Sequence, residues 1–302
     1  MPPTSLAHDV RTAVFPAAGL GTRMLPATKA SPKEMLNVVD KPVIQYGVEE
    51  AVRSGLEHVV IVTAARKTIM EDHFDYAPEL ERLLEAKGKG AERDEMRRIA
   101  DLAAISYVRQ KEARGLGHAV LCAKPIVGDR PFCVFLPDDI IDAGDDPVMA
   151  QLLRVYAERR RPVVAVERVP RQDVSKYGIL AVEDVAPRLF RIKAMVEKPK
   201  LADAPSDLAI MGRYVLTPQI WEALERTDPG AGGEIQLTDG IARLMEQGDV
   251  FAYQYEGRRY DCGSKLGYLQ ATVELALKRS DLGADFRAYL DELLSEKQWR
   301  AA

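Results

Sequence analysis

A glycine-rich segment near the amino end combines small residues with a permanent cation: Ala17, Ala18, Gly19, Gly21 and Arg23. Small side chains let backbone N–H groups meet phosphate oxygens, and arginine adds a planar, charged fork. The segment therefore predicts an anion-binding loop, the alternative being a tight turn without a ligand. It is not a Rossmann fingerprint, because Met24 stands where the third glycine belongs, and no Gly-Lys-Ser/Thr follows to make a P-loop.

Two further cations, Lys29 and Lys33, follow that loop. The chain of 302 residues carries 42 Lys and Arg against 46 Asp and Glu, a net charge of −4, so this local group of cations departs from the overall balance. A single surface lysine is usually only solvated, but the neighbouring loop favours a phosphate contact for Lys33. We therefore expect Lys33 and Arg23 to act on an anionic substrate.

The composition excludes several classes of protein. A weakly acidic chain lacks the basic excess that binding to nucleic acid requires. No apolar run approaches the ~18 residues of a membrane span, and the first residues do not resemble a leader, so we expect a cytoplasmic protein without membrane contact. Three widely spaced cysteines, Cys122, Cys133 and Cys262, predict buried free thiols rather than disulfides or a metal site.

Two carboxylates follow a later apolar run. Asp138 and Asp139 come directly after the segment 132–137. In open α/β sheets, ligands bind at the carboxyl edge of the strands. Paired carboxylates at such an edge suit Mg²⁺, although Asp139 has an alternative use as a cap of the next turn.

The elements that must position these residues alternate between strand and helix. Apolar, β-branched runs lie at 12–16, 58–63, 105–109, 132–137 and 163–169, with helical patterns between them, as over 44–55. This alternation predicts an α/β fold with a Rossmann-like, mostly parallel sheet flanked by helices. Strand-like segments then follow one another at 178–182, 188–197 and 210–216, and a helix and a further strand-like segment at 250–260 come after them. No linker divides the chain, so we expect a single domain over 1–302 with an elaborated C-terminal part.

Two helical regions lie outside this pattern. A charged stretch at 79–101, interrupted at 87–90, predicts a surface insertion without a catalytic role. Two helices are expected from residue 265 onward, the last at about 283–302. The last helix has an apolar stripe of Leu290, Leu293 and Leu294. The stripe predicts packing on the core, and contact with a partner subunit is the alternative.

The glycine loop and the residues after it resemble the sugar nucleotidyltransferases. The resemblance rests first on Gly19-Leu20-Gly21-Thr22-Arg23, Pro32-Lys33-Glu34-Met35-Leu36 and Asp40-Lys41-Pro42. Later segments are similar to bacterial members that join UTP to glucose 1-phosphate: Gly115-Leu116-Gly117-His118-Ala119, Leu136-Pro137-Asp138-Asp139, Lys176-Tyr177-Gly178, Val196-Glu197-Lys198-Pro199, Gly212-Arg213-Tyr214, Gly232-Gly233-Glu234-Ile235-Gln236-Leu237-Thr238-Asp239 and Asp261-Cys262-Gly263-Ser264-Lys265. Together these motifs cover roughly residues 10 to 280.

This resemblance implies synthesis of UDP-glucose and pyrophosphate from UTP and glucose 1-phosphate, with Mg²⁺, on a nucleotide-diphospho-sugar transferase fold. It implies a nucleotide-binding half at about 10–140, a sugar-phosphate-binding half at about 141–280, and a homo-oligomer of two or four chains. Nucleotide contacts fall to Ala17, Ala18, Gly19, Gly21, Gln110, Gly115, Gly117 and His118. The resemblance assigns sugar-phosphate contacts to Asp139, Gly178, Glu197 and Lys198. It assigns catalysis to Arg23, Lys33 and Lys198, and Mg²⁺ binding to Asp138 with Asp261.

The chemistry of several side chains suits these roles. Gln110 has a donor and an acceptor for the polar edge of uracil, unless it is a solvated loop amide. Glu197 beside Lys198 matches the hydroxyls and the dianion of a sugar phosphate, unless the two form an exposed pair. The other histidines, His8, His58 and His73, are interpreted as structural or surface residues. Glu234 and Gln236 belong to a motif whose role the sequence does not explain.

The implied reaction needs no general base, since the second pKa of a phosphate monoester is about 6 and the nucleophile is already ionised. Two other functions stay open. An inactive sugar-nucleotide-binding paralogue is expected to have lost Arg23, Lys33, Asp138, Lys198 or Asp261, and all five are present. The other open function is that of a relative that uses dTTP or another sugar 1-phosphate. Uracil and thymine differ by one methyl group, which a binding pocket can distinguish by only ~1–3 kcal/mol of binding free energy.

Overall fold

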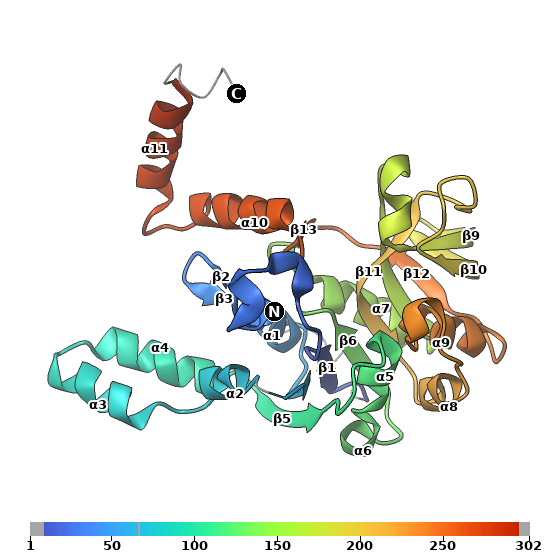
Figure 1. Cartoon of the computed structure of the whole chain (residues 1–302), viewed down its shortest axis with the longest axis horizontal. Coiled ribbons are helices and arrows are strands. Elements are labelled where there is room, and N and C mark those ends of the chain that lie inside the picture. Colours follow the sequence, from blue (N-terminus) through green and yellow to red (C-terminus); the bar gives the residue numbers. More distant parts are fainter. Residues whose placement is uncertain (1–8, 66, 296–302) are drawn as a thin grey trace.

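A computed structural model describes residues 9–65 and 67–295 as one nine-stranded sheet covered by helices (Figure 1). The strand order is β5-β4-β1-β6-β11-β8-β12-β10-β9. These strands are β1 Thr12–Pro16, β4 His58–Thr63, β5 Ala104–Arg109, β6 Phe132–Phe135, β8 Val163–Arg168, β9 Gly178–Ala186, β10 Leu189–Glu197, β11 Leu208–Leu216 and β12 Phe251–Gln254. Two separate pairs are β2 Asn37–Val38 with β3 Lys41–Pro42, and β7 Asp139–Asp142 with β13 Arg258–Asp261. The expected α/β class is confirmed.

The first four strands in that order are parallel, as the alternating pattern predicts. Within β1, Ala13 and Phe15 join one hydrophobic core and Val14 joins the other, because successive strand residues point to opposite faces. Parallel strands also end at the same edge of the sheet. The loops after β1, β4, β5 and β6 therefore meet there, and they carry the first group of predicted site residues.

The second half of the sheet is mixed rather than mostly parallel. β11 runs antiparallel to β6 and β8, and β10 runs antiparallel to β12 and β9, whereas β8 and β12 are parallel. The strands β9, β10 and β11 follow one another without the intervening helices that parallel crossovers need. The expectation of one strand at 250–260 was wrong, because the chain turns at Gly257 (φ +151°) and β13 pairs with β7.

Helices cover both faces of the sheet. α1 Val43–Arg53, α2 Ile69–Phe74 and α7 Val148–Arg159 pack on one face, and α5 Leu116–Leu121, α8 Gln219–Glu225 and α9 Leu237–Met245 on the other. α6 is Lys124–Val127. Gly47 lets α1 approach β1, because a Cβ there would lie 2.8 Å from the ring of Phe15. None of the helices among the described residues is long and apolar enough to cross a membrane.

The charged insertion is confirmed as a surface helical hairpin. α3 Pro78–Ala86 and α4 Gly90–Ala100 project from the body of the molecule and are joined by the turn at 87–89 (Figure 1). Salt bridges between the two helices and within α4 pair several of its charges; Arg93, for example, lies 3.1 Å from Glu85. The hairpin lies away from the predicted site residues.

The two expected C-terminal helices are α10 Lys265–Leu277 and α11 Gly283–Ser295. The expectation that α11 packs on the core was wrong. This helix points away from the body (Figure 1), and over Gly283–Ser295 only Gly283 is buried. Leu294 is 66% exposed, while Leu290 and Leu293 are half-buried. Residues 296–302 of the predicted helix lie outside the described residues.

The cysteines and two of the histidines are structural, as expected. All three cysteines are free thiols; Cys133 and Cys262 are buried and Cys122 is half-buried. His58 Nε2 lies 2.9 Å from Ser106 Oγ, and His73 Nε2 lies 2.8 Å from Gln45 Oε1. His8 lies outside the described residues.

Candidate active site

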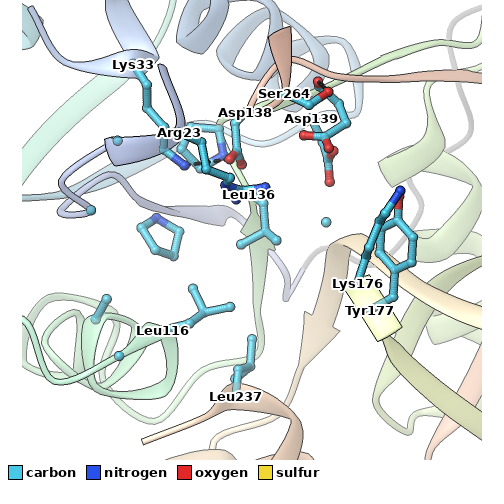
Figure 2. Close-up of a pocket in the computed structure, with 18 of the residues that line it drawn as sticks. Arg23, Lys33, Leu116, Leu136, Asp138, Asp139, Lys176, Tyr177, Leu237 and Ser264 are labelled. Atoms are coloured by element: carbon cyan, nitrogen blue, oxygen red, sulfur yellow. Dashed lines mark hydrogen bonds and ion pairs between the residues drawn. The ribbon is translucent and has the colours of Figure 1, made fainter. Parts of the chain in front are cut away.

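A cavity of about 1210 Å³ opens at the carboxyl edge of the parallel strands (Figure 2). Its lining contains most of the predicted site residues, from both halves of the chain: Ala18, Gly19, Gly21, Arg23, Lys33, Gln110, Gly115, Asp138, Asp139, Gly178, Glu197, Lys198 and Asp261. Ala17, Gly117 and His118 do not line it. Figure 2 shows Arg23, Lys33 and Asp138 on one side of the cavity and Lys176 with Tyr177 across from them.

The glycine loop exposes backbone donors to this cavity. Gly21 adopts the left-handed conformation (φ +65°), which favours glycine, and its carbonyl accepts a hydrogen bond from Thr28 Oγ1 at 2.8 Å. Within the described chain, the N–H groups of residues 18–21 donate no hydrogen bond. Free donors lining a cavity are suited to phosphate oxygens, so the geometry supports the anion-binding interpretation.

The cations of this region separate into two kinds. Lys33 begins the 3-10 helix Lys33–Met35, and its Nζ lies 2.5 Å from Asp138 Oδ2. Arg23 lies on the 3-10 helix Thr22–Met24 and lines the cavity from an exposed position. Lys29 is exposed and does not line the cavity. Lys33 and Arg23 are therefore the two cations placed to meet a substrate.

The contact between Lys33 and Asp138 keeps both groups charged. Burial alone would lower the pKa of the Lys33 ammonium, but Asp138 and Glu34 beside it raise that pKa above its usual value. Burial likewise would raise the pKa of Asp138, and the charge of Lys33 outweighs it, so this pKa lies below its usual range. A full positive and a full negative charge thus face each other in the cavity.

Asp138 and Asp261 converge on one point although they are distant in the sequence. A Cβ at Gly263 would lie 2.7 Å from Asp138 Oδ2 and 3.0 Å from Asp261 Oδ1. The Gly263 N–H donates to that Asp261 oxygen at 3.0 Å, and the Cys262 N–H donates to the Asp138 carbonyl at 2.9 Å. Two carboxylates beside an anion-binding loop suit a divalent metal that takes its other ligands from phosphates and water. No cluster of three or more His, Cys, Asp or Glu ligands exists in the part of the chain that the structure describes.

Asp139 is an ion-pair partner, not a simple cap. Its Oδ1 accepts from Arg259 Nε at 2.7 Å, and a Cβ at Gly212 would lie 2.5 Å from its Oδ2. Arg259 also lines the cavity and stacks over the ring of Tyr177 at 5.4 Å. The pair joins β7 to β13 and so fixes Asp139 beside the sugar-phosphate residues.

The second glycine segment packs against protein. A Cβ at Gly115 (φ +98°) would lie 2.8 Å from the carbonyl oxygen of Ile235, and one at Gly117 would lie 2.9 Å from the same oxygen. The Gly117 N–H donates to that oxygen at 2.8 Å. The backbone near Glu234 therefore requires these glycines, which gives the Glu234–Gln236 motif a role in shaping the cavity.

Gln110 is buried rather than solvated, with 7% of its surface exposed. Its Nε2 donates to the Gly115 carbonyl at 3.1 Å and to His118 Nδ1 at 2.9 Å. Burial lowers the pKa of His118 and thus favours the neutral ring that can accept this bond. His118 lies behind Gln110 and orients its amide, whose oxygen makes no hydrogen bond among residues 9–65 and 67–295.

β10 ends at Glu197, and Glu197 and the following Lys198 both line the cavity. Glu197 Oε2 accepts from Thr238 Oγ1 at 2.8 Å, and Lys198 Nζ lies 3.0 Å from Glu197 Oε1. Lys198 has φ +46°, a left-handed conformation that costs a non-glycine residue about 1–2 kcal/mol. A side chain at Gly178 would press its Cβ to 3.2 Å from Glu197. The Glu197–Lys198 pair is partly exposed, as the alternative of an exposed pair predicts, but both residues also line the cavity.

Sequence reasoning missed three polar side chains of this site. Lys67, after β4, contacts the glycine loop from behind. Glu34 is fully buried, lines the cavity, and leaves Oε1 without a partner among the described residues. Arg259 was missed although it precedes Asp261 by two positions. The signal for Lys67 was its place after a buried strand next to β1, since such loops share one edge of the sheet.

This fold and site define a nucleotidyltransferase, and the Nucleotidyl transferase family model matches residues 12–278. The chain is 50% identical over 289 residues to the UTP–glucose-1-phosphate uridylyltransferase of Bacillus subtilis strain 168, covering 96% of this chain and 99% of that relative. A UDP-glucose pyrophosphorylase complexed with UDP-glucose has a TM-score of 0.82 at 45% identity and covers 89% of this chain and 100% of its own. A UTP-bound UGPase from Acinetobacter baumannii has a TM-score of 0.88 at 42% identity, over 94% of this chain and 99% of its own. The chain belongs to the family of UTP–glucose-1-phosphate uridylyltransferases.

Proposed function

We propose that this protein transfers the uridylyl group of UTP to α-D-glucose 1-phosphate, giving UDP-glucose and pyrophosphate, with Mg²⁺ as its metal. One observation carries the proposal. A single cavity is lined both by the glycine loop with Arg23 and Lys33 and by the Glu197–Lys198 pair, so two anionic substrates can meet in it. The relatives whose names describe this reaction match nearly the whole chain.

The reaction forms a bond between a phosphate oxygen of the sugar phosphate and the α-phosphorus of UTP, and it breaks the bond from that phosphorus to the bridging oxygen of pyrophosphate. The loop amides, Arg23 and Lys33 bind the triphosphate and offset the charge that develops on the leaving group. Lys198 holds the attacking phosphate in line, and Glu197 accepts hydrogen bonds from sugar hydroxyls. Because the nucleophile is already ionised, positioning and charge account for the catalysis.

Asp138 and Asp261 are the residues that would hold Mg²⁺. When bound, the ion would supply positive charge that offsets the negative charge of the substrate phosphates. Lys33 Nζ lies against Asp138 Oδ2, so this lysine would turn from the carboxylate toward the substrate if Asp138 held the ion.

In this proposal, Gln110 recognises the base of the nucleotide. Its free amide oxygen can accept from the N3–H of uracil, while His118 fixes the amide nitrogen. Thymine offers the same N3–H, so this contact does not separate UTP from dTTP.

The proposed reaction predicts that pyrophosphate is released from UTP only when a sugar 1-phosphate is present. Glucose 1-phosphate should be the best acceptor and ATP a poor donor. A coupled pyrophosphate assay across panels of nucleotides and sugar 1-phosphates measures this. A preference for dTTP would assign the protein to another branch of the family. Absence of turnover with every pair of nucleotide and sugar 1-phosphate would favour an inactive paralogue.

Lys198→Ala should weaken the sugar-phosphate side of the reaction. We expect KM for glucose 1-phosphate to rise roughly tenfold or more, because a charge-assisted contact is worth about 1.5–3 kcal/mol. Calorimetry should show UTP affinity within twofold of the parent. Lys200→Ala is the matched control, an exposed lysine two residues along that does not line the cavity. Loss of UTP affinity in Lys198→Ala alone would reverse the assignment.

The expected homo-oligomer fits the apolar side chains that α11 leaves uncovered. We propose that Tyr289 and Leu294, both exposed in the single chain, contact a second copy. Light scattering of the purified protein should give the mass of two or four chains, and a monomer at micromolar concentration would contradict this. The expectation of a cytoplasmic location stays a prediction.

A further inference from the structure

We propose that Lys67 is a positioning residue that holds the glycine loop in its anion-binding conformation. The inference rests on the proposed function only in taking the triphosphate of UTP as the ligand of that loop. Lys67 follows β4, the strand beside β1 in the sheet, so its side chain reaches the loop after β1 from behind.

The ammonium of Lys67 contacts three acceptors. Its Nζ donates to the carbonyl of Ala17 at 2.6 Å, to that of Gly19 at 2.7 Å, and to Glu34 Oε2 at 3.1 Å. An ammonium has three hydrogens, so this set uses all of them. Lys67 is 8% exposed and Glu34 is 0% exposed, and a lysine buried to this degree is rare without such pairing.

The two loop carbonyls determine where the loop amides point. In a trans peptide unit the C=O and the N–H lie in one plane and point in opposite directions, on either side of the C–N bond. Because the carbonyls of Ala17 and Gly19 turn toward Lys67, the N–H groups of the same two peptide units, those of Ala18 and Leu20, turn the other way. Ala18 and Leu20 line the cavity, and the described chain offers neither N–H an acceptor.

Glu34 makes the buried cation tolerable. Burial lowers the pKa of Lys67 and raises that of Glu34, and each charge offsets part of the penalty on the other. Removing Lys67 alone would therefore leave the buried Glu34 carboxylate without the cation that hydrogen-bonds to it, which is strongly destabilising. A single variant could lose activity simply by unfolding.

The experiment compares Glu34→Gln with the double variant Lys67→Met/Glu34→Gln. Both lack the buried negative charge, and the pair differs in Lys67 alone. We expect the double variant to melt within a few degrees of Glu34→Gln yet to bind UTP roughly 10- to 100-fold more weakly in calorimetry, as misplacement of a binding group by about 1 Å can produce. KM of the double variant for glucose 1-phosphate at saturating UTP should stay within threefold of the value for Glu34→Gln. General loss of structure would not weaken UTP binding while leaving this KM unchanged.

Lys41→Met is the matched control, since Lys41 pairs with Glu49 at 2.7 Å outside the cavity and should leave UTP affinity unchanged. Equal UTP affinity in Glu34→Gln and the double variant would overturn the positioning role and leave Lys67 as a stabilising residue. That result leaves the proposed function intact, because pyrophosphate release by the parent tests the latter separately.

Discussion

Replacement of Lys33 by alanine should lower kcat by roughly 10²–10³, the usual loss when one preorganised donor to a developing oxyanion is removed. Lys33 is better placed than Arg23, because it begins a short helix at the cavity wall and its Nζ lies 2.5 Å from Asp138. The variant loses the positive charge next to the triphosphate and also leaves the Asp138 carboxylate without a partner. Steady-state kinetics at saturating UTP and glucose 1-phosphate measure the change in kcat.

Three variants make the result specific. Lys29→Ala removes a nearby exposed lysine that does not line the cavity and should keep kcat within twofold of the parent. Arg23→Ala should fall in the same range as Lys33→Ala, since Arg23 lines the cavity. Lys33→Arg keeps the charge and should recover part of the loss. Turnover within threefold of the parent in both Lys33→Ala and Arg23→Ala would make these cations bystanders.

The parallel half of the fold could be predicted because each β-branched run is separated from the next by a helical pattern. Position after a buried strand was enough to place Gly19, Gln110 and Asp138 at one edge, since parallel strands end together. The mixed half could not be oriented in this way. Strand-like segments that follow one another are compatible with several pairings, and the turn at Gly257 that divides 250–260 has little local signal.

Polar contacts inside the site were harder to predict than the lining. Small residues at Gly115 and Gly117 showed that something approaches closely, but not that it is the backbone of Ile235. Asp139 and Arg259 are 120 positions apart, and only the pairing of β7 with β13 brings them together. The family motifs predicted which residues meet the substrate, whereas the contacts of Lys67 with the carbonyls of the glycine loop can be found only from the three-dimensional structure.

Asp138→Asn and Asp261→Asn should each raise the Mg²⁺ concentration needed for half-maximal activity. Both carboxylates face the backbone at Gly263, and a Mg²⁺ site built on two carboxylates has no spare protein ligand. We expect at least the roughly 10- to 100-fold loss in metal affinity that follows removal of a group supporting a metal ligand. Asp261→Asn is the cleaner variant, because Asp138→Asn also breaks the ion pair with Lys33.

A shared site has a further consequence, because two residues that hold one ion are not independent. The double variant should lose little more metal affinity than the worse single one, whereas separate sites would give additive free energies. Calorimetric titration of Mg²⁺ in the presence of UDP-glucose measures this apart from turnover. Asp142→Asn is the control, since Asp142 accepts a hydrogen bond from Lys278 and does not line the cavity.

In a complex with UDP-glucose and Mg²⁺, a carboxylate oxygen of Asp138 and one of Asp261 should each lie about 2.0–2.1 Å from the ion. Full activity of Asp261→Asn at limiting Mg²⁺ would refute the shared site.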